Sequence, residues 1–151
     1  MSHKSQTISI LAVLAILLLA AACSRTETPN SSDSIQGVLW QWFSLTNQTT
    51  RETQTIPNSE NYTITFNADG TLTGKADCNN FTGTYSQENG FKITLGASTM
   101  AFCGEASLDQ QYLTLLSNVA AGGPDGAGNL ALETAGGEQR MIFNNGGQSQ
   151  Q

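Results

Sequence analysis

The sequence predicts an α+β, β-rich fold, in which a curled antiparallel sheet of about six to seven strands packs against one main helix. Three observations predict this fold class. Several short segments alternate apolar and polar residues, with the period of two that a half-buried strand requires. Turn-forming residues separate these segments, as at 67–70 and 88–90. A single segment, from Leu108 to Ala120, instead spaces its apolar residues with the period of a helix.

The aromatic residues near the start of the folded part lie on a predicted strand at 38–45. Successive side chains of a strand point to opposite faces, so Trp40 and Trp42 share one face and Leu39 lies on the other. We expect the two tryptophans in the core; if exposed, they would form an apolar or sugar-stacking surface. The remaining strands are expected, mostly as consecutive hairpins, at 62–66, 71–75, 81–85, 91–95, 129–134 and 139–143.

The helix is predicted from apolar residues that recur at i, i+4, i+7, i+8 and i+11, namely Leu108, Tyr112, Leu115, Leu116 and Val119. Ser107 precedes this stripe and Gln110 follows three residues later, which is the pattern of a capping box. The glycine-rich segment 122–128 is expected to end the helix and to form a loop.

The first 22 residues are predicted to be a signal peptide. Their unbroken apolar run, 10–22, is shorter than the about 20 residues that a helix needs to cross a bilayer core. Three alanines stand directly before Cys23, and this arrangement resembles a bacterial lipobox. The resemblance implies cleavage before Cys23 and fatty acylation of the new terminus. An ordinary secretory signal with a cleavage site nearby is the alternative.

Residues 23–36 are predicted to be a lipidated, flexible tether, because their polar composition buries too little apolar surface to order the chain. A flexible coil of this length spans about 20 Å. The folded domain is expected at 37–143, and a disordered tail at 144–151. We expect the protein in the cell envelope, held to a membrane by the lipid on Cys23. By resemblance to diderm lipoproteins, Ser24 directs it to an outer membrane; otherwise it lies on the outer face of the cytoplasmic membrane.

The composition argues against several classes of function. The chain carries 6 basic and 12 acidic side chains, a formal net charge of −6, which disfavours nucleic acid as a partner. Removal of the leader takes away Lys4 and leaves 5 basic and 12 acidic side chains, a net charge of −7. It also takes away His3, the only histidine in the sequence. The commonest general base and metal ligand is then absent. We expect no cofactor, no metal site and no catalytic residue.

Cys78 and Cys103 remain once Cys23 carries lipid. The oxidising compartment of an exported chain favours a disulfide between them. Two cysteines without histidine are too few ligands for a zinc site. A pair of buried free thiols is the alternative.

Two other patterns favour structural roles over chemistry. Asp77 and Glu105 flank the two cysteines, and paired carboxylates can act as acid and base. A chain with 12 acidic residues, however, places such pairs near each other by chance. Asp125 and Asn129 lie in the glycine-rich segment, where they would hold Ca²⁺ only weakly.

A series of motif residues occurs in one order along the chain: Trp40, Trp42, Gly74, Cys78, Asn79, Phe81, Gly83, Tyr85, Thr99, Met100, Ala101 and Cys103. Together they resemble the META domain, which occurs in heat-inducible envelope lipoproteins related to a protein linked with novobiocin resistance. The resemblance covers 37–143. The two tryptophans, with departures from the usual pattern at Asp77, Met100 and Phe102, indicate a Trp-x-Trp subgroup. The resemblance implies a compact, β-rich, non-catalytic domain in which the motif residues are structural.

Within the motif, we expect Asn79 and Asn80 to hydrogen-bond the local backbone of a turn. Gly74 and Gly83 are expected to permit the close approach of a neighbouring segment or a bulge.

We therefore expect a monomeric, membrane-anchored envelope lipoprotein with a non-catalytic domain that binds an envelope protein or small ligand, or supports stress tolerance. The first alternative is a small inhibitor of a secreted hydrolase, which would act through a loop such as 44–59 or 122–129. The second is a hydrolase that uses carboxylates alone, for which Asp77 and Glu105 are the candidates.

Overall fold

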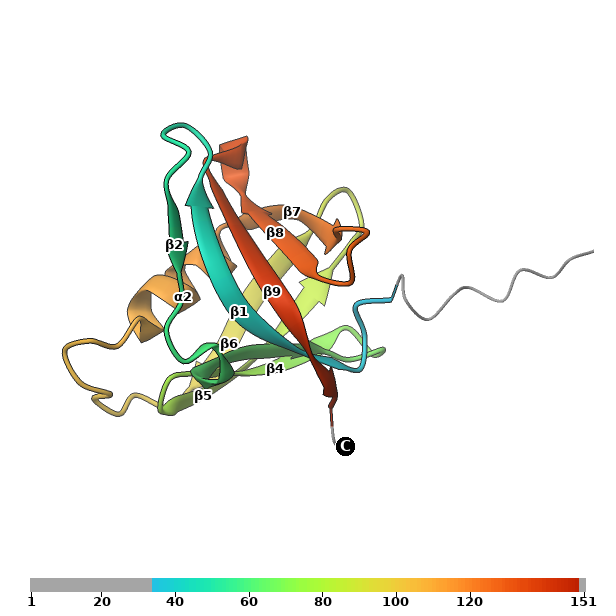
Figure 1. Cartoon of the computed structure of the whole chain (residues 1–151). Helices are drawn as coiled ribbons and strands as arrows, with labels where there is room; N and C mark the ends of the chain where they lie inside the picture. The colour runs from blue at the N-terminus through green and yellow to red at the C-terminus, as the bar shows by residue number, and fades with distance from the viewer. Residues whose placement is uncertain (1–33, 150–151) are drawn as a thin grey trace, which may run out of the picture. The chain divides into compact units, whose positions relative to one another are not determined.

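The computed structural model describes residues 34–149, which form one domain (Figure 1). The predictions for the leader, for Cys23 and for most of the tether lie outside the described residues. The strands are β1 (Val38–Asn47), β2 (Thr53–Thr55), β3 (Tyr62–Phe66), β4 (Thr71–Ala76), β5 (Asn79–Ser86), β6 (Lys92–Ser98), β7 (Val119–Pro124), β8 (Leu130–Thr134) and β9 (Gln139–Gln148). The main helix is α2 (Asp109–Ser117), and η2 (Ser59–Asn61) and η3 (Ala135–Gly137) are single 3₁₀ turns. No helix among these residues is long and apolar enough to cross a membrane.

The strands form one antiparallel sheet that curls into a half-barrel, as Figure 1 shows. Their order across the sheet is β6-β5-β4-β3-β1-β9-β8-β7, and β2 pairs only with β1. The curl brings the two outer strands together, because the N–H of Phe91 donates to the C=O of Ala120 at 3.0 Å. The predicted fold class is therefore confirmed, with nine strands in place of six or seven.

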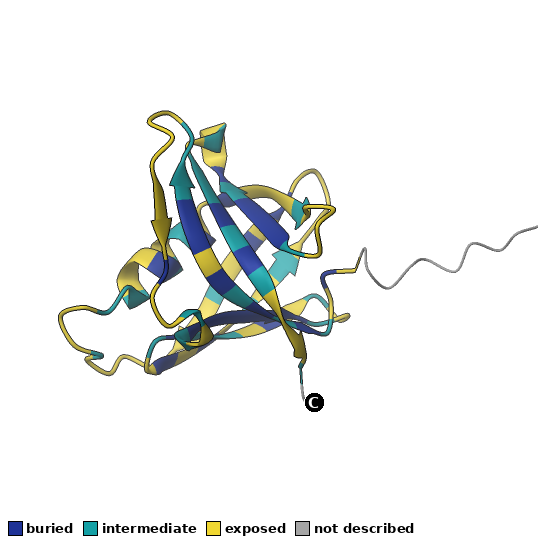
Figure 2. Cartoon of the chain, in the orientation of Figure 1, coloured by how far each residue is buried: buried dark blue, intermediate teal, exposed yellow. Residues whose placement is uncertain are grey.

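Trp42 lies at the centre of the core, where it is completely buried. Its ring stacks on Tyr112 of α2, with centroids 5.1 Å apart, and meets the edge of Tyr62 of β3 at 5.9 Å. Trp40 is buried on the same face, and Leu39 lies half-buried on the other, so both tryptophans are core residues. Figure 2 shows the resulting alternation of buried and more exposed residues along β1. Because α2 places Tyr112 against rings from four strands, the helix closes the core of the half-barrel.

Two glycines let neighbouring groups approach closely, as predicted. A methyl group on Gly74 would collide with the ring of Phe81 and with the backbone C=O of Thr63. A methyl group on Gly83 would collide with the backbone C=O of Thr94. Backbone atoms cannot move aside without breaking the sheet, so both positions require glycine.

The helix is shorter than predicted, and the segment after it is a strand. It ends at Ser117, and the backbone of Asn118 leaves the helical region at φ −100° and ψ 4°. Val119 then pairs with Thr134 of β8, so the glycine-rich segment begins as β7 and not as a loop. Pairing with β8 thus outweighs the helical spacing of Val119. The capping box is also absent, because the Ser107 hydroxyl accepts the N–H of Asp109 and not that of Gln110.

The domain extends beyond both predicted boundaries. At its start, Ile35 is buried, and its C=O accepts the indole N–H of Trp40 at 2.8 Å, so this residue belongs to the folded domain. At its end, β9 continues to Gln148, where a disordered tail was predicted from 144. β9 continues beyond Phe143, its last apolar residue, because its polar end still pairs with β1, as far as Val38 opposite Gln148. The apolar periodicity stops at Phe143 and therefore does not predict this part of the strand.

The hydroxyl of Tyr112 is the one buried side-chain polar group without a hydrogen-bond partner in the described residues. Replacement of Tyr112 by Phe is therefore expected to leave the free energy of unfolding unchanged or to raise it by about 1 kcal/mol. Tyr62 is the matched control, because its hydroxyl accepts the N–H of Leu108 at 2.9 Å. Tyr62→Phe should lower the free energy of unfolding by about 1–2 kcal/mol in the same urea titration. Equal losses in the two variants would contradict the assignment.

Alkaline pH provides a second test of Tyr112→Phe. Burial raises the pKa of Tyr112 well above its usual value of 10.0. Above pH 10 the unfolded chain loses this proton while the folded chain keeps it, so the unfolded state binds fewer protons and stability falls as pH rises. Tyr112→Phe should remove part of this decline above pH 10 and leave stability at neutral pH as described above.

Candidate functional site

A disulfide joins Cys78, in the turn between β4 and β5, to Cys103, in the loop after β6. The two Cα atoms are 5.6 Å apart. The predicted pairing is therefore present, and Cys78 is exposed to solvent. Asp77 adopts a left-handed conformation at φ 57°, which turns the chain sharply before the cysteine. The bond fastens a long irregular segment to the edge of the sheet.

Asn79 holds the same segment by its side chain. Its Oδ1 accepts the N–H of Ala101 at 2.7 Å and the hydroxyl of Thr99 at 3.0 Å. Its Nδ2 donates to the C=O of Ala101 at 3.0 Å and lies 3.3 Å from a carboxylate oxygen of Asp109 in α2. The local turn bonding predicted for Asn79 is wrong: the amide instead joins three segments that are distant in the sequence. It is buried, and each of its polar atoms has a partner.

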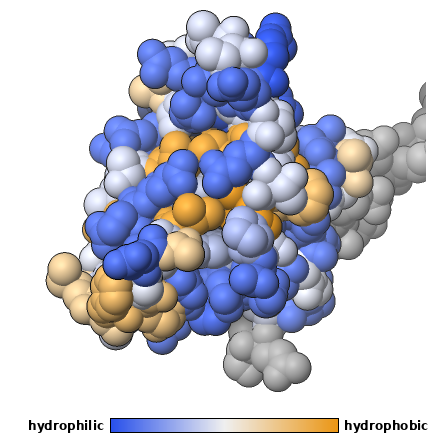
Figure 3. Space-filling model, turned by 60° about the vertical axis from the view of Figure 1, so that its left-hand side comes forward, coloured by the Kyte–Doolittle hydropathy of each residue, from blue (hydrophilic) through white to orange (hydrophobic). Residues whose placement is uncertain are grey.

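Met100 and Phe102 stand on either side of the residue that Asn79 holds. Met100 is 91% exposed and Phe102 is 84% exposed, whereas the backbone N–H and C=O of Ala101 between them are both hydrogen-bonded to the Asn79 side chain. In Figure 3 this loop forms an apolar cluster at the lower left. We call residues 99–107 the braced loop. Met100, predicted to be structural, instead faces solvent.

The braced loop and the start of α2 enclose a hollow of about 600 Å³. Glu105 and Asp109 lie at its lining, and Leu113 contributes a half-buried apolar side chain. Among the described residues that line it, none is Lys or Arg. The lining of the hollow therefore combines apolar and polar side chains, and its charged groups are all acidic. This arrangement suits binding, since it combines exposed apolar side chains with one sign of charge.

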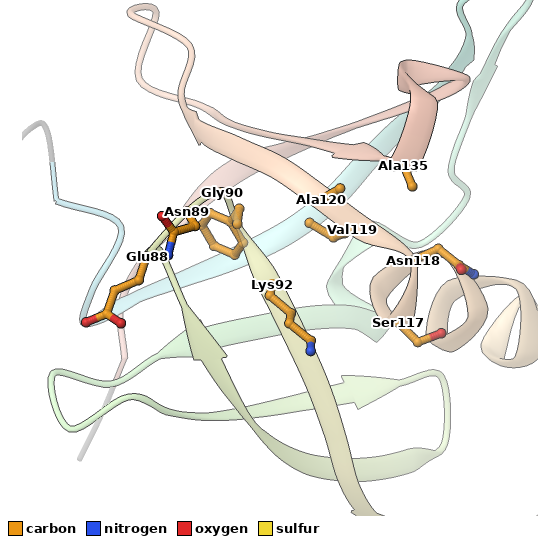
Figure 4. Close-up of a pocket in the computed structure, with 10 residues that line it drawn as sticks. Glu88, Asn89, Gly90, Lys92, Ser117, Asn118, Val119, Ala120 and Ala135 are labelled. Carbon is orange, nitrogen blue, oxygen red and sulfur yellow. The ribbon is translucent and has the colours of Figure 1, made fainter.

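A second pocket, of about 390 Å³, lies at the seam where the sheet nearly closes (Figure 4). The turn before β6, the end of α2 and the start of β7 form its walls. Its charged lining residues are the basic Lys92 and the acidic Glu88, which lies in the turn. The pocket is shallow and presents no cluster of reactive groups among the residues that the structure describes.

The suggested Ca²⁺ ligands are engaged with each other. Asp125 accepts the backbone N–H groups of Ala127 and Asn129 at 2.8 and 3.0 Å and the side-chain amide of Asn129 at 2.9 Å. The hydrogen bond from the Asn129 side chain, followed by that from the Ala127 backbone, lowers the pKa of the Asp125 carboxyl below its usual value. These bonds make Asp125 the centre of a turn. Within 34–149, no three His, Cys, Asp or Glu residues are grouped closely enough to hold a metal ion.

Loss of the Asn79 side chain should release the braced loop. Asn79→Ala is expected to lower the free energy of unfolding by about 1–3 kcal/mol, because buried partners lose their hydrogen bonds. Amide hydrogen exchange at Ala101 should accelerate by more than the change in global stability explains. Asn80→Ala is the control, because this neighbouring side chain is exposed and only its backbone bonds to Thr99. Equal exchange at Ala101 in both variants would exclude the bracing role.

Comparison with known proteins supports the fold and the family. A family model described as META domain matches residues 33–146. The NMR structure of a protein from Burkholderia xenovorans is similar with a TM-score of 0.59 and 17% identity, covering 76% of this chain and 86% of that one. The crystal structure of a DUF4847 family protein from Bacteroides vulgatus has a TM-score of 0.55 and 15% identity, covering 77% and 96%. No curated protein matches the sequence.

Proposed function

The chain belongs to the META domain family, and on this premise we propose that it is a membrane-anchored envelope lipoprotein that binds another envelope component through the braced loop. META domains are generally non-catalytic, and the family match supports a non-enzymatic, envelope-associated domain. The observation that carries the proposal is the exposure of Met100 and Phe102 on a segment that a disulfide and Asn79 hold in place. Large exposed apolar side chains in one cluster are typical of an interaction site.

The sequence around Cys23 supports the proposed lipid anchor. An apolar run that ends in three alanines and a cysteine resembles a processing site for lipoproteins. The disulfide between Cys78 and Cys103 fits the same route, because such bonds form and persist outside the reducing cytosol. The acyl chains would hold the domain at the membrane surface by way of the residues before Ile35.

Membrane fractionation tests the anchor. The wild-type chain should sediment with membranes and enter the detergent phase, whereas Cys23→Ser should lose acylation and leave that phase. The double variant Cys78→Ser, Cys103→Ser is the control for loss of a cysteine and should remain anchored. A wild-type chain without membrane association would contradict the proposal.

A role in envelope stress tolerance has its own test. Deletion of the gene for this chain from the same host should increase the sensitivity of the cells to heat.

Inhibition of a secreted hydrolase is the second candidate function. The loops predicted for it lie partly in strands, since 44–47 belong to β1, 53–55 to β2 and 122–124 to β7. The observation in its favour is now the braced loop, because a fixed loop loses little conformational entropy on binding. Stoichiometric inhibition of a purified envelope hydrolase, abolished by Phe102→Ser but not by Phe43→Ser, would establish it.

A further inference from the structure

The surroundings of the braced loop indicate the chemistry of what it binds. We propose that the braced loop docks a protein segment that carries both apolar and basic side chains. Met100 and Phe102 supply the apolar contacts, and both are exposed on a backbone that is already fixed at Ala101 and Cys103. A partner therefore gains their burial without the entropic cost of ordering the loop.

The charge around the loop selects the partner. Glu105 and Asp109 line the same hollow as the apolar side chains of Met100 and Phe102. None of the described basic residues lines this hollow: Arg51 follows β1, Lys75 of β4 donates to Asn61, and Lys92 lies at the seam pocket. Arg140 pairs with Glu133 at 3.1 Å. A basic segment would therefore meet complementary charge, which speeds association and excludes acidic partners.

The position of the loop on the domain favours a protein over the membrane to which the chain is anchored. Ile35 and Gln36, where the chain enters the domain, lie beside Tyr85 at the far end of β5, because the Gln36 amide donates to the Tyr85 hydroxyl at 2.8 Å. Asn79 and the disulfide lie at the opposite end of this strand. The strand separates the two by about 20 Å. This step rests on the proposed anchor. In addition, anionic lipids would repel the acidic side chains Glu105 and Asp109 at the hollow.

Site-specific photocrosslinking in the bacterial host tests the inference with the full chain. A benzophenone amino acid replaces Phe102, and in a matched control it replaces Phe43, the other described exposed phenylalanine, which lies on β1. We expect one discrete protein adduct from position 102 and none from position 43. The crosslinked peptide of the partner should contain Lys or Arg beside apolar residues. Glu105→Arg should reduce the adduct at least fivefold, whereas Glu88→Arg, the same charge change at the far end of β5, should leave it unchanged.

The other outcomes overturn the inference. Adducts to lipid only, to a second copy of the chain, or with equal yield from positions 102 and 43 would each exclude it, as would an adduct insensitive to Glu105→Arg. Intact masses from the same cells report acylation of Cys23 separately. A correctly acylated chain without an adduct refutes the docking site alone, whereas an unacylated chain that still forms the adduct refutes the anchor alone.

Discussion

Reduction of the disulfide between Cys78 and Cys103 is expected to lower the free energy of unfolding by roughly 3.5 kcal/mol, the loop-closure entropy of a 25-residue loop. The bond fixes the braced loop to the turn before β5, so its loss also loosens the contacts that Asn79 makes. Urea unfolding of the purified domain with and without a reductant measures the effect.

The double variant Cys78→Ser, Cys103→Ser is the control for this experiment. It should unfold at the lower urea concentration in both conditions, because no bond remains for the reductant to break. A wild-type domain whose unfolding midpoint is the same with and without reductant would contradict a stabilising disulfide.

Replacement of Trp42 by Ala is expected to lower the free energy of unfolding by about 3–5 kcal/mol. The side chain is completely buried, it stacks on Tyr112, and its indole N–H donates to the C=O of Ser44 at 3.1 Å. Removal leaves a cavity between β1 and α2 that neither element can fill without losing other contacts. Thermal and urea unfolding should both show the loss.

Phe43, the next residue, is the control for Trp42. It is 43% exposed on the opposite face of β1, so Phe43→Ala should cost less than about 1 kcal/mol. A loss in Phe43→Ala as large as that in Trp42→Ala would mean that the faces of β1 are assigned wrongly.

The sequence predicts those strands in which apolar and polar residues alternate along the chain. The alternation at 62–66 predicts a strand with the bounds that β3 has. The strand near the two tryptophans is predicted with the correct buried face, although it continues to Asn47. In both, the apolar period marks the side chains that face the core, so a local pattern locates the strand. In β3, however, Thr63 and Thr65 are buried too, so the alternation does not predict that both faces of this strand are covered.

Other elements depend on partners that lie far away in the sequence. Thr53, Gln54 and Thr55 are all exposed and carry no apolar period, so β2 exists only through its pairing with β1. Val119 continues the helical spacing of α2, yet it pairs with Thr134 and begins β7. The polar end of β9 is likewise a strand because β1 lies beside it.

The candidate site was predicted only in part. The cysteine pair is recognisable because few alternatives remain for two thiols in an exported chain. The bracing role of Asn79 is not, because its partners at Thr99, Ala101 and Asp109 become neighbours only in the folded domain. One signal for the exposed loop was present: Met100 and Phe102 lie outside every periodic segment and precede Gly104.

The most direct test of an exported, acylated and disulfide-stabilised domain is the intact mass of the protein extracted from host membranes after alkylation without reductant. We predict a polypeptide that starts at Cys23, carries fatty acyl groups and takes up no alkylating agent at Cys78 or Cys103. A mass that retains residues 1–22, lacks acyl groups or shows two alkylated cysteines would contradict it.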